Sequence, residues 1–305
     1  MLLIFQNVMP VFVLMALGRA LGRTKFIPRE FFAASDRLVY FIFFPALLFW
    51  KIGGAESSRI NWSLTGPVLG LLLTAWLLSL VYVKATRAPD FQVGAFSQCC
   101  YRFNTYIGFA VVLSSLGEEG VREFSLLISL LIPTLNLMAV STLIWHSQSE
   151  YSFRDKTVLF FKAALANPLI IACLAGLLYS NLKIPLPVFF RNTFELASVA
   201  ALPLALLAIG NSLTLEKLKG NFRPALVAAM IKQGFLPAAG FFLLPYLGVS
   251  GVALKAGLLY LAMPTSVAAF ILSSQLNSDA DLASACIVLS TLLSFFSLSA
   301  VMLTF

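Results

Sequence analysis

Long apolar runs, separated by short charged or Gly- and Pro-containing loops, fill almost the whole of this 305-residue chain. A helix needs about 20 predominantly apolar residues to cross the hydrocarbon core of a bilayer. Windows of about that size occur at 2–20, 36–53, 63–84, 92–116, 122–145, 158–180, 193–213, 224–245, 252–274 and 282–304. The pattern therefore predicts an all-α polytopic membrane protein with ten transmembrane helices.

The composition excludes the soluble classes, because 60% of the residues are apolar and only 11% are charged, against about half and a quarter in soluble domains. The apolar runs are continuous and do not alternate with polar residues, which excludes an outer-membrane barrel. The net charge of +8 fits basic loops that orient membrane helices. We therefore expect the lipid bilayer as a partner and no nucleic acid.

The positive charge is distributed unevenly between the two sides of the predicted membrane. Thirteen of the 21 Lys and Arg residues lie at or after the odd-numbered spans, six follow the even-numbered spans and two lie inside spans. Because cytoplasmic loops are enriched in Lys and Arg, we expect the odd loops to be cytoplasmic and both termini to face outward.

The two halves of the chain, 1–150 and 151–305, share a weak internal repeat. The matching residues lie 158 positions apart and are Pro10 with Pro168, Gly18 with Gly176, and Pro45 with Pro203. Each half holds five spans, and an odd number inverts the second repeat relative to the first. Inverted repeats are typical of secondary transporters with a site near the middle of the membrane.

The fourth span of each half is interrupted near its middle, by the polar stretch Gln98–Gly108 in the first half and by Ala262–Ser266 in the second. Irregular backbone at membrane depth is tolerated beside protein or a cavity, and the positive N-terminal end of a half-helix suits a carboxylate. We expect the two interruptions to cross and to form a substrate pocket from Asn104, Thr105, Pro264, Thr265 and Ser266. The alternatives are a helix cap at Asn104 and an ordinary proline kink at Pro264.

Arg102 and Lys232 are the two basic residues inside predicted spans, and a buried charge there is costly. If either lines the pathway, the substrate is an anion. The alternatives are that Arg102 satisfies carbonyls freed at the break, or that these side chains snorkel to the surface. Asn136 also lies inside a predicted span. We expect it to contact the substrate, and the alternative is a hydrogen bond between helices.

Enzyme and cofactor chemistry lack their motifs in this sequence. There is no HExxH metal motif, no GxSxG elbow, no P-loop and no pair of intramembrane aspartates. The carboxylates lie at span ends and in loops, and the cysteines show no metal-ligand spacing. We therefore expect no enzyme activity, no metal site and no cofactor. A passive channel remains the closest alternative to a carrier.

The interrupted segments resemble those of the auxin efflux carrier family, which includes bacterial malate/malonate permeases. Arg102–Gly108 is similar to the family's fourth-span Asn-containing motif, and Met263–Val267 resembles its ninth-span motif. Asn167–Ile170 and Pro203–Leu206 resemble its sixth- and seventh-span patterns. One departure is that Val267 is followed by two alanines where members often have an Asn.

The resemblance implies two inverted five-helix repeats, as in bile-acid sodium symporters, with helices 4 and 9 crossing at an organic-anion site. Asn104 and Pro264 would mark that crossover. Helices 1, 2, 6 and 7 would form a scaffold, against which helices 3–5 and 8–10 move. The implied protein is a compact bacterial form in the inner membrane with periplasmic termini, and the family allows a homodimer.

The sequence thus predicts a secondary transporter of a small organic anion, such as malate, malonate or an auxin-like acid, working by alternating access. It leaves open the coupling ion, H⁺ or Na⁺, and the direction of transport. The alternatives are a passive channel and a sodium-coupled symporter of a different organic solute.

Overall fold

The regular secondary structure is helical in the part of the chain that the computed structural model describes, residues 2–54, 61–146, 154, 157–158, 167–182, 184, 186–213, 216 and 218–305. The first half contains α1 (Leu2–Arg23), α2 (Arg29–Leu38), the π-helical turn η1 (Val39–Phe43), α3 (Phe44–Gly53), α4 (Trp62–Thr86), α5 (Asp90–Tyr101) and α6 (Thr105–Trp145). The second contains α8 (Pro168–Leu182), α9 (Val188–Ser212), α10 (Leu218–Ala229), η3 (Met230–Phe235), α11 (Leu236–Tyr246), α12 (Gly251–Ala262), α13 (Ala268–Gln275) and α14 (Ala280–Met302).

Six continuous helical segments of the described residues are long and apolar enough to cross a membrane. They cover 30–53, 62–86, 90–145, 188–212, 218–246 and 280–302, and two shorter apolar helices cover 168–182 and 251–262. Large apolar side chains also lie on the outside, since Leu77 is 55% and Phe242 74% exposed. An apolar outer surface of this kind is stable against lipid, whereas soluble proteins rarely expose large apolar patches.

The described helices follow the predicted windows, with differences at their ends. The helical segment that contains the window 36–53 already begins at Arg29. The sequence predicts a loop between the windows 92–116 and 122–145, but helix continues on both sides of Gly117, which has φ 62° and ψ −156°. Such a conformation is essentially restricted to glycine, so a single residue turns the chain there. Residues 159–166 of the window 158–180 lie outside the described residues.

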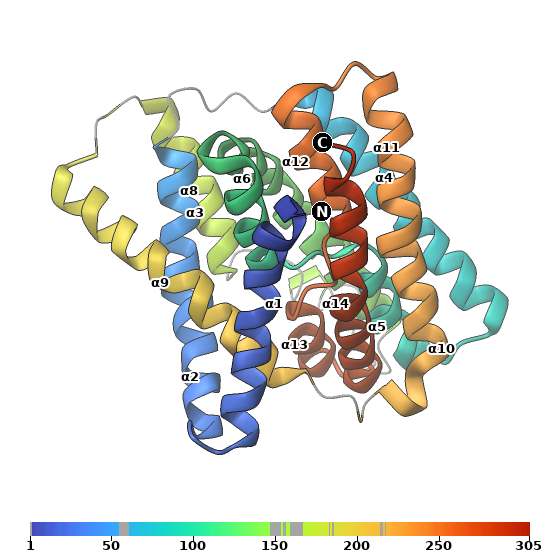
Figure 1. Cartoon of the computed structure of the whole chain (residues 1–305). Coiled ribbons are helices and arrows are strands. Elements are labelled where there is room, and N and C mark those ends of the chain that lie inside the picture. Colours follow the sequence, from blue (N-terminus) through green and yellow to red (C-terminus); the bar gives the residue numbers. More distant parts are fainter. Residues whose placement is uncertain are drawn as a thin grey trace.

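One group of helices is formed by α1, α2, α3, α8 and α9, which lie together in Figure 1. In this group α1 packs along α9, and α3 packs along α8. A Cβ atom on Gly18 would overlap the carbonyl oxygen of Leu207, and one on Gly210 would overlap that of Met15. The glycines therefore let the backbones of α1 and α9 touch.

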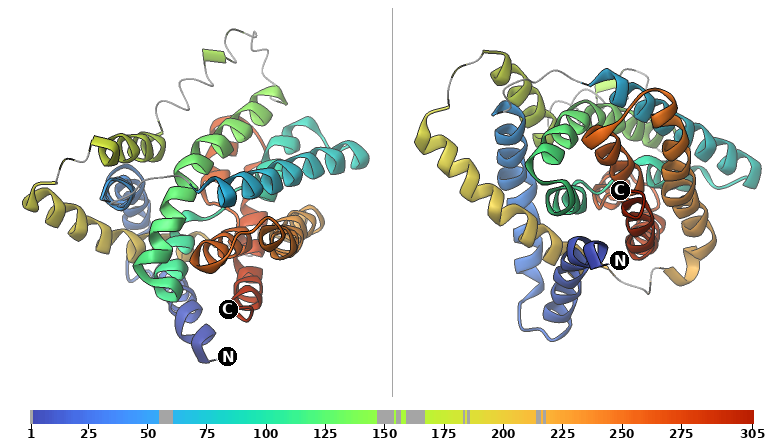
Figure 2. Two further views of the ribbon diagram at one scale, coloured as in Figure 1. Left: turned by 90° about the horizontal axis from the view of Figure 1, so that it is seen from above. Right: turned by 45° about the horizontal axis from the view of Figure 1, so that its top comes forward.

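The second group contains α4, α5 and α10–α14, and α6 lies between the two groups (Figures 1 and 2). Here α10 packs on α14, α11 packs on α4, and α12 packs on α6. This group and α6 hold large buried aromatic residues, including Tyr101, Phe124 and Tyr260. This group, with α6, contains the two interrupted helices that form the candidate site.

Candidate anion site at the helix crossover

Two interrupted helices meet in the interior of the protein. α5 ends at Tyr101 and α6 begins at Thr105, whereas α12 ends at Ala262 and α13 begins at Ala268. The backbone N–H of Asn104 donates a hydrogen bond of 2.8 Å to the carbonyl oxygen of Pro264. The two irregular segments are therefore in direct contact, as the sequence predicts.

Side chains within the breaks accept hydrogen bonds from backbone N–H groups at the start of the helices that follow. Asn104 Oδ1 accepts hydrogen bonds from the backbone N–H groups of Tyr106 and Ile107, at 3.1 and 3.2 Å. Ser266 Oγ accepts one from the N–H of Ala268 at 3.2 Å. The unpaired N–H groups of a helix start carry partial positive charge. The positive ends of α6 and α13 thus lie next to each other at the crossover.

The helices that end at the crossover have their carbonyl groups satisfied by side chains from elsewhere. Thr265 Oγ1 donates to the carbonyl oxygen of Cys99 at 2.9 Å, and Ser297 Oγ donates to that of Ala262 at 2.9 Å. Lys232 Nζ donates to the carbonyl oxygen of Leu261 at 3.0 Å. An unpaired carbonyl in this environment would cost several kcal/mol. These contacts therefore stabilise the interrupted backbone of both helices.

Arg102 is held by two amide side chains. Its side chain is 8% exposed, Nη1 donates to Gln98 Oε1 at 3.2 Å, and Nη2 donates to Asn136 Oδ1 at 2.9 Å. Both partners are neutral, so the positive charge has no ion-pair partner among the described residues. A guanidinium has five N–H donors, and these two contacts leave donors for a ligand.

A cavity of about 610 Å³ lies between α2, η1 and the start of α8 on one side and the crossover helices on the other. A smaller cavity of about 40 Å³ reaches the first residues of α6 and α13. The two cavities share five lining residues: Tyr40, Arg102, Asn136, Asn167 and Ala268. The two cavities therefore adjoin each other, and the smaller one lies at the positive helix ends.

Four of the predicted site residues line these cavities, namely Arg102, Thr105, Asn136 and Ser266. Asn104, Pro264 and Thr265 do not line either cavity and stand behind them at the crossover, within the hydrogen bonds given above. The buried Nδ2 of Asn104 has no hydrogen-bond partner among the described residues. Asn104 is thus a helix cap through its oxygen and an unused donor through its nitrogen.

Lys232 is fully buried, which is incompatible with snorkelling to the surface. It also lies outside the lining of both crossover cavities. Its Nζ instead bonds to the carbonyl oxygen of Leu261 at the end of α12 and faces neither cavity.

Sequence reasoning did not assign several neighbouring residues to the substrate site. Asp36 and Tyr40 line the larger cavity, and their spacing of four residues, which places them on one helix face, was the available signal. Gln98 is one helical turn before Arg102, which equally suggests a contact. Asn167 caps α8 through a hydrogen bond of 2.9 Å from the N–H of Leu169 and also lines both cavities.

Comparison with known proteins agrees with this architecture. The chain is 24% identical to an uncharacterized transporter of Methanothermobacter thermautotrophicus over 298 residues, 96% of this chain and 95% of the relative. It is 24% identical to an uncharacterized transporter of Methanocaldococcus jannaschii over 264 residues, 84% of each chain. The sequence profile of the membrane transport protein family matches residues 3–152 and 147–302. The chain therefore belongs to this family, the auxin efflux carriers, and is a multi-pass membrane transport protein and not an enzyme.

Proposed function

We propose that this protein is a secondary active transporter that moves a small organic anion, such as malate, malonate or an auxin-like acid, by alternating access. The observation that carries the proposal is the meeting of three positive groups at one cavity. These are the N-terminal ends of α6 and α13 and the guanidinium of Arg102. Helix N-termini and arginine side chains are the groups that bind carboxylates in transporters and other proteins.

The buried amide nitrogen of Asn104 adds a fourth group. Leaving a buried donor without a partner costs about 1–3 kcal/mol. In the proposed complex a substrate carboxylate reaches this donor when the crossover adjusts around it, with Thr105 and Ser266 beside it. The geometry of the interrupted segments is maintained by the hydrogen bonds of Thr265, Pro264 and Lys232. Asn136 orients the guanidinium group of Arg102.

An inverted repeat of five plus five spans is part of the proposal, and the packing supports it. Shifting by 158 residues relates Gly18 to Gly176 and Ile52 to Gly210. Gly18 and Gly210 form the close contact between α1 and α9, and a Cβ on Gly176 would lie 3.0 Å from Cβ of Ile52 between α8 and α3. The shift therefore relates α1 to α8 and α3 to α9. The contact of α1 with α9 corresponds to the contact of α8 with α3, as an inverted repeat requires.

The same packing supports the proposed division into moving parts. The group of α1, α2, α3, α8 and α9 acts as the scaffold, and α4–α6 with α10–α14 act as the transport domain. The cavity of about 610 Å³ separates these groups beside Asp36 and Tyr40. About 22 Å further along the same helical segment, by helical rise, Lys51 Nζ pairs with Glu118 Oε2 at 2.7 Å.

Two further contacts close the scaffold against the transport domain on the Lys51 side. Ser114 Oγ donates to the carbonyl oxygen of Asn7 at 3.0 Å, and the rings of Phe44 and Tyr106 lie 4.5 Å apart. A protein open at one end and closed at the other is what alternating access requires in each of its states. By the distribution of Lys and Arg, the open end is cytoplasmic.

The proposed location is the inner membrane, with both termini periplasmic. No cofactor is needed for this mechanism, and the energy comes from a gradient of the substrate or of H⁺ or Na⁺. A homodimer through the scaffold is compatible with the proposal, because the scaffold helices present apolar outer faces such as Leu196 and Val199, 74% and 70% exposed.

Ligand-induced thermal stabilisation of the purified protein tests the substrate class. We expect the melting temperature to rise with one or more small mono- or dicarboxylates at millimolar concentration, because a ligand that binds only the folded state stabilises it. The panel is measured with and without Na⁺, which separates a sodium-coupled symporter from a sodium-independent carrier. Stabilisation only by neutral or cationic solutes would overturn the anion assignment.

A further inference from the structure

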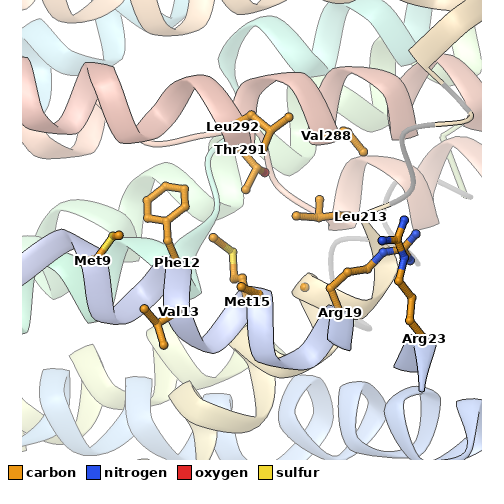
Figure 3. A pocket seen from close by; sticks show the side chains of 12 residues that line it. Met9, Phe12, Val13, Met15, Arg19, Arg23, Leu213, Val288, Thr291 and Leu292 are labelled. Atoms are coloured by element: carbon orange, nitrogen blue, oxygen red, sulfur yellow. The ribbon is translucent and has the colours of Figure 1, made fainter. Parts of the chain in front are cut away.

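A second cavity lies away from the crossover site, between α1, the end of α9 and α14. Its volume is about 460 Å³, and its lining comes from Met9–Arg23 of α1, from Gly210 and Leu213, and from Val288–Leu292 of α14. Figure 3 shows apolar side chains along most of its length and the guanidinium groups of Arg19 and Arg23 together at one end. We call this cavity the α1–α14 groove.

The apolar part of the α1–α14 groove opens sideways toward the surrounding membrane. Val13 is 54% and Leu292 48% exposed, and both line the groove. From Met9 to Arg23, α1 rises about 21 Å, compared with about 15 Å of hydrocarbon in one leaflet. The groove therefore extends from the interior of the bilayer to the level of the headgroups.

The two arginines concentrate positive charge at one end of the groove. Arg19 Nη1 donates to the carbonyl oxygen of Asn211 at 3.2 Å, and Arg23 is exposed. Within the described residues no carboxylate forms an ion pair with either of them. Two adjacent guanidinium groups repel each other, and a phosphate between them would relieve the repulsion through charge-assisted hydrogen bonds.

We propose that the α1–α14 groove binds an anionic phospholipid of the leaflet next to Arg19 and Arg23. One acyl chain lies along Phe12, Val13 and Leu292, and the phosphate lies between the two arginines. This occupant fits the combination of a lateral opening, an apolar floor and a basic end, whereas a small soluble anion would leave the apolar length empty. The proposal concerns the lipid alone and holds whatever the transported substrate is.

Native mass spectrometry of the detergent-purified protein, titrated with defined lipids, tests this site. The probes are phosphatidylglycerol and phosphatidylcholine with identical acyl chains. The variants are Arg23→Gln, which removes charge while keeping the Arg19 contact with α9, and Ala16→Trp, which fills the groove at an exposed lining position. The matched control is Arg223→Gln, an exposed arginine on α10 outside the groove.

We expect wild-type protein to bind phosphatidylglycerol more tightly than phosphatidylcholine. Arg23→Gln should weaken phosphatidylglycerol binding about fivefold, the effect of one basic residue near a charged lipid surface. Ala16→Trp should weaken the binding of both lipids, and Arg223→Gln should change neither. Circular dichroism and a single size-exclusion peak verify that each variant is folded.

Three results would overturn the proposal. Equal binding of both lipids would remove the role of the phosphate charge. Equal effects of Arg23→Gln and Arg223→Gln would show that overall charge, and not the groove, attracts the lipid. Full displacement of phosphatidylglycerol by millimolar inorganic phosphate would indicate a site for a soluble anion.

Discussion

At the scale of single residues, Asn104 combines two roles in one side chain. Its Oδ1 caps α6, its backbone N–H bonds to Pro264, and its Nδ2 is a buried donor without a partner among the described residues. A serine at this position keeps a capping oxygen but has no amide nitrogen. The two roles can therefore be separated experimentally.

We predict that Asn104→Ser folds normally but loses most of its carboxylate-induced thermal stabilisation. The matched control is Asn61→Ser, because Asn61 caps α4 through a hydrogen bond of 3.3 Å from the N–H of Leu64. That control should lower the melting temperature slightly, by the small difference between Asn and Ser caps, and keep the ligand response. An unchanged ligand response in Asn104→Ser would exclude Nδ2 from the site.

Arg102 gives a second prediction at this scale. Arg102→Gln should raise the KM of uptake by about 10- to 100-fold, since a hydrogen bond to a charged group contributes about 1.5–3 kcal/mol. Arg102→Lys should have an intermediate effect, because a lysine keeps the charge but not the planar contacts with Gln98 and Asn136. Uptake kinetics at several substrate concentrations measure this, and equal KM values for all three proteins would rule Arg102 out as a substrate contact.

The sequence could identify these residues only in part. A charge inside an apolar run made Arg102 conspicuous, and so did the interruption around Asn104. Sequence could not separate Thr105, which lines a cavity, from Thr265, whose hydroxyl is used by Cys99. The difference depends on tertiary packing, which brings the carbonyl group of Cys99 on α5 within hydrogen-bonding distance of the Thr265 hydroxyl.

At the scale of helices, the interruption between α5 and α6 and the one between α12 and α13 stabilise each other. The break in one helix supplies hydrogen-bonding groups to the other, through Asn104 with Pro264 and through Thr265 with Cys99. The sequence predicted the positions of both breaks, because polar and proline residues inside apolar windows are visible without a structure. It placed a loop near Gly117, where the structure has a one-residue turn between helical segments.

The glycine contact between α1 and α9 gives a prediction for this scale. Gly18→Ala should destabilise the protein by about 1–3 kcal/mol, the usual cost of overpacking, because the new methyl group would overlap the backbone of Leu207. The control is Gly70→Ala on α4, where a Cβ meets nothing within 4 Å. Thermal unfolding in detergent compares the two, and equal melting temperatures would contradict the close backbone contact.

At the scale of the whole molecule, the ion pair of Lys51 with Glu118 joins the proposed scaffold to the transport domain. Glu118 has a side-chain exposure of 73%, so the pair contributes at most about 1 kcal/mol. That is enough to change the ratio of two conformations about fivefold. The pair is therefore suited to bias the equilibrium between open states without locking it.

We predict that Lys51→Glu exposes the crossover to the side on which the pair lies. The reporter is a thiol introduced by Thr105→Cys, since the four native cysteines are buried. A membrane-impermeant thiol reagent, applied to right-side-out and inside-out vesicles, should label it from the Lys51 side up to about fivefold faster in Lys51→Glu. The double variant Lys51→Glu with Glu118→Lys, which swaps the charges, should restore the original labelling rate. A double variant that is labelled as fast as Lys51→Glu alone would contradict the role of the pair.

Counterflow in proteoliposomes tests the central claim most directly. The labelled substrate is a carboxylate that stabilises the purified protein. A carrier with alternating access should show uptake that saturates with external substrate and becomes faster when the lumen contains unlabelled substrate. Uptake that rises linearly with concentration and ignores the internal substrate would contradict the account and identify a passive channel.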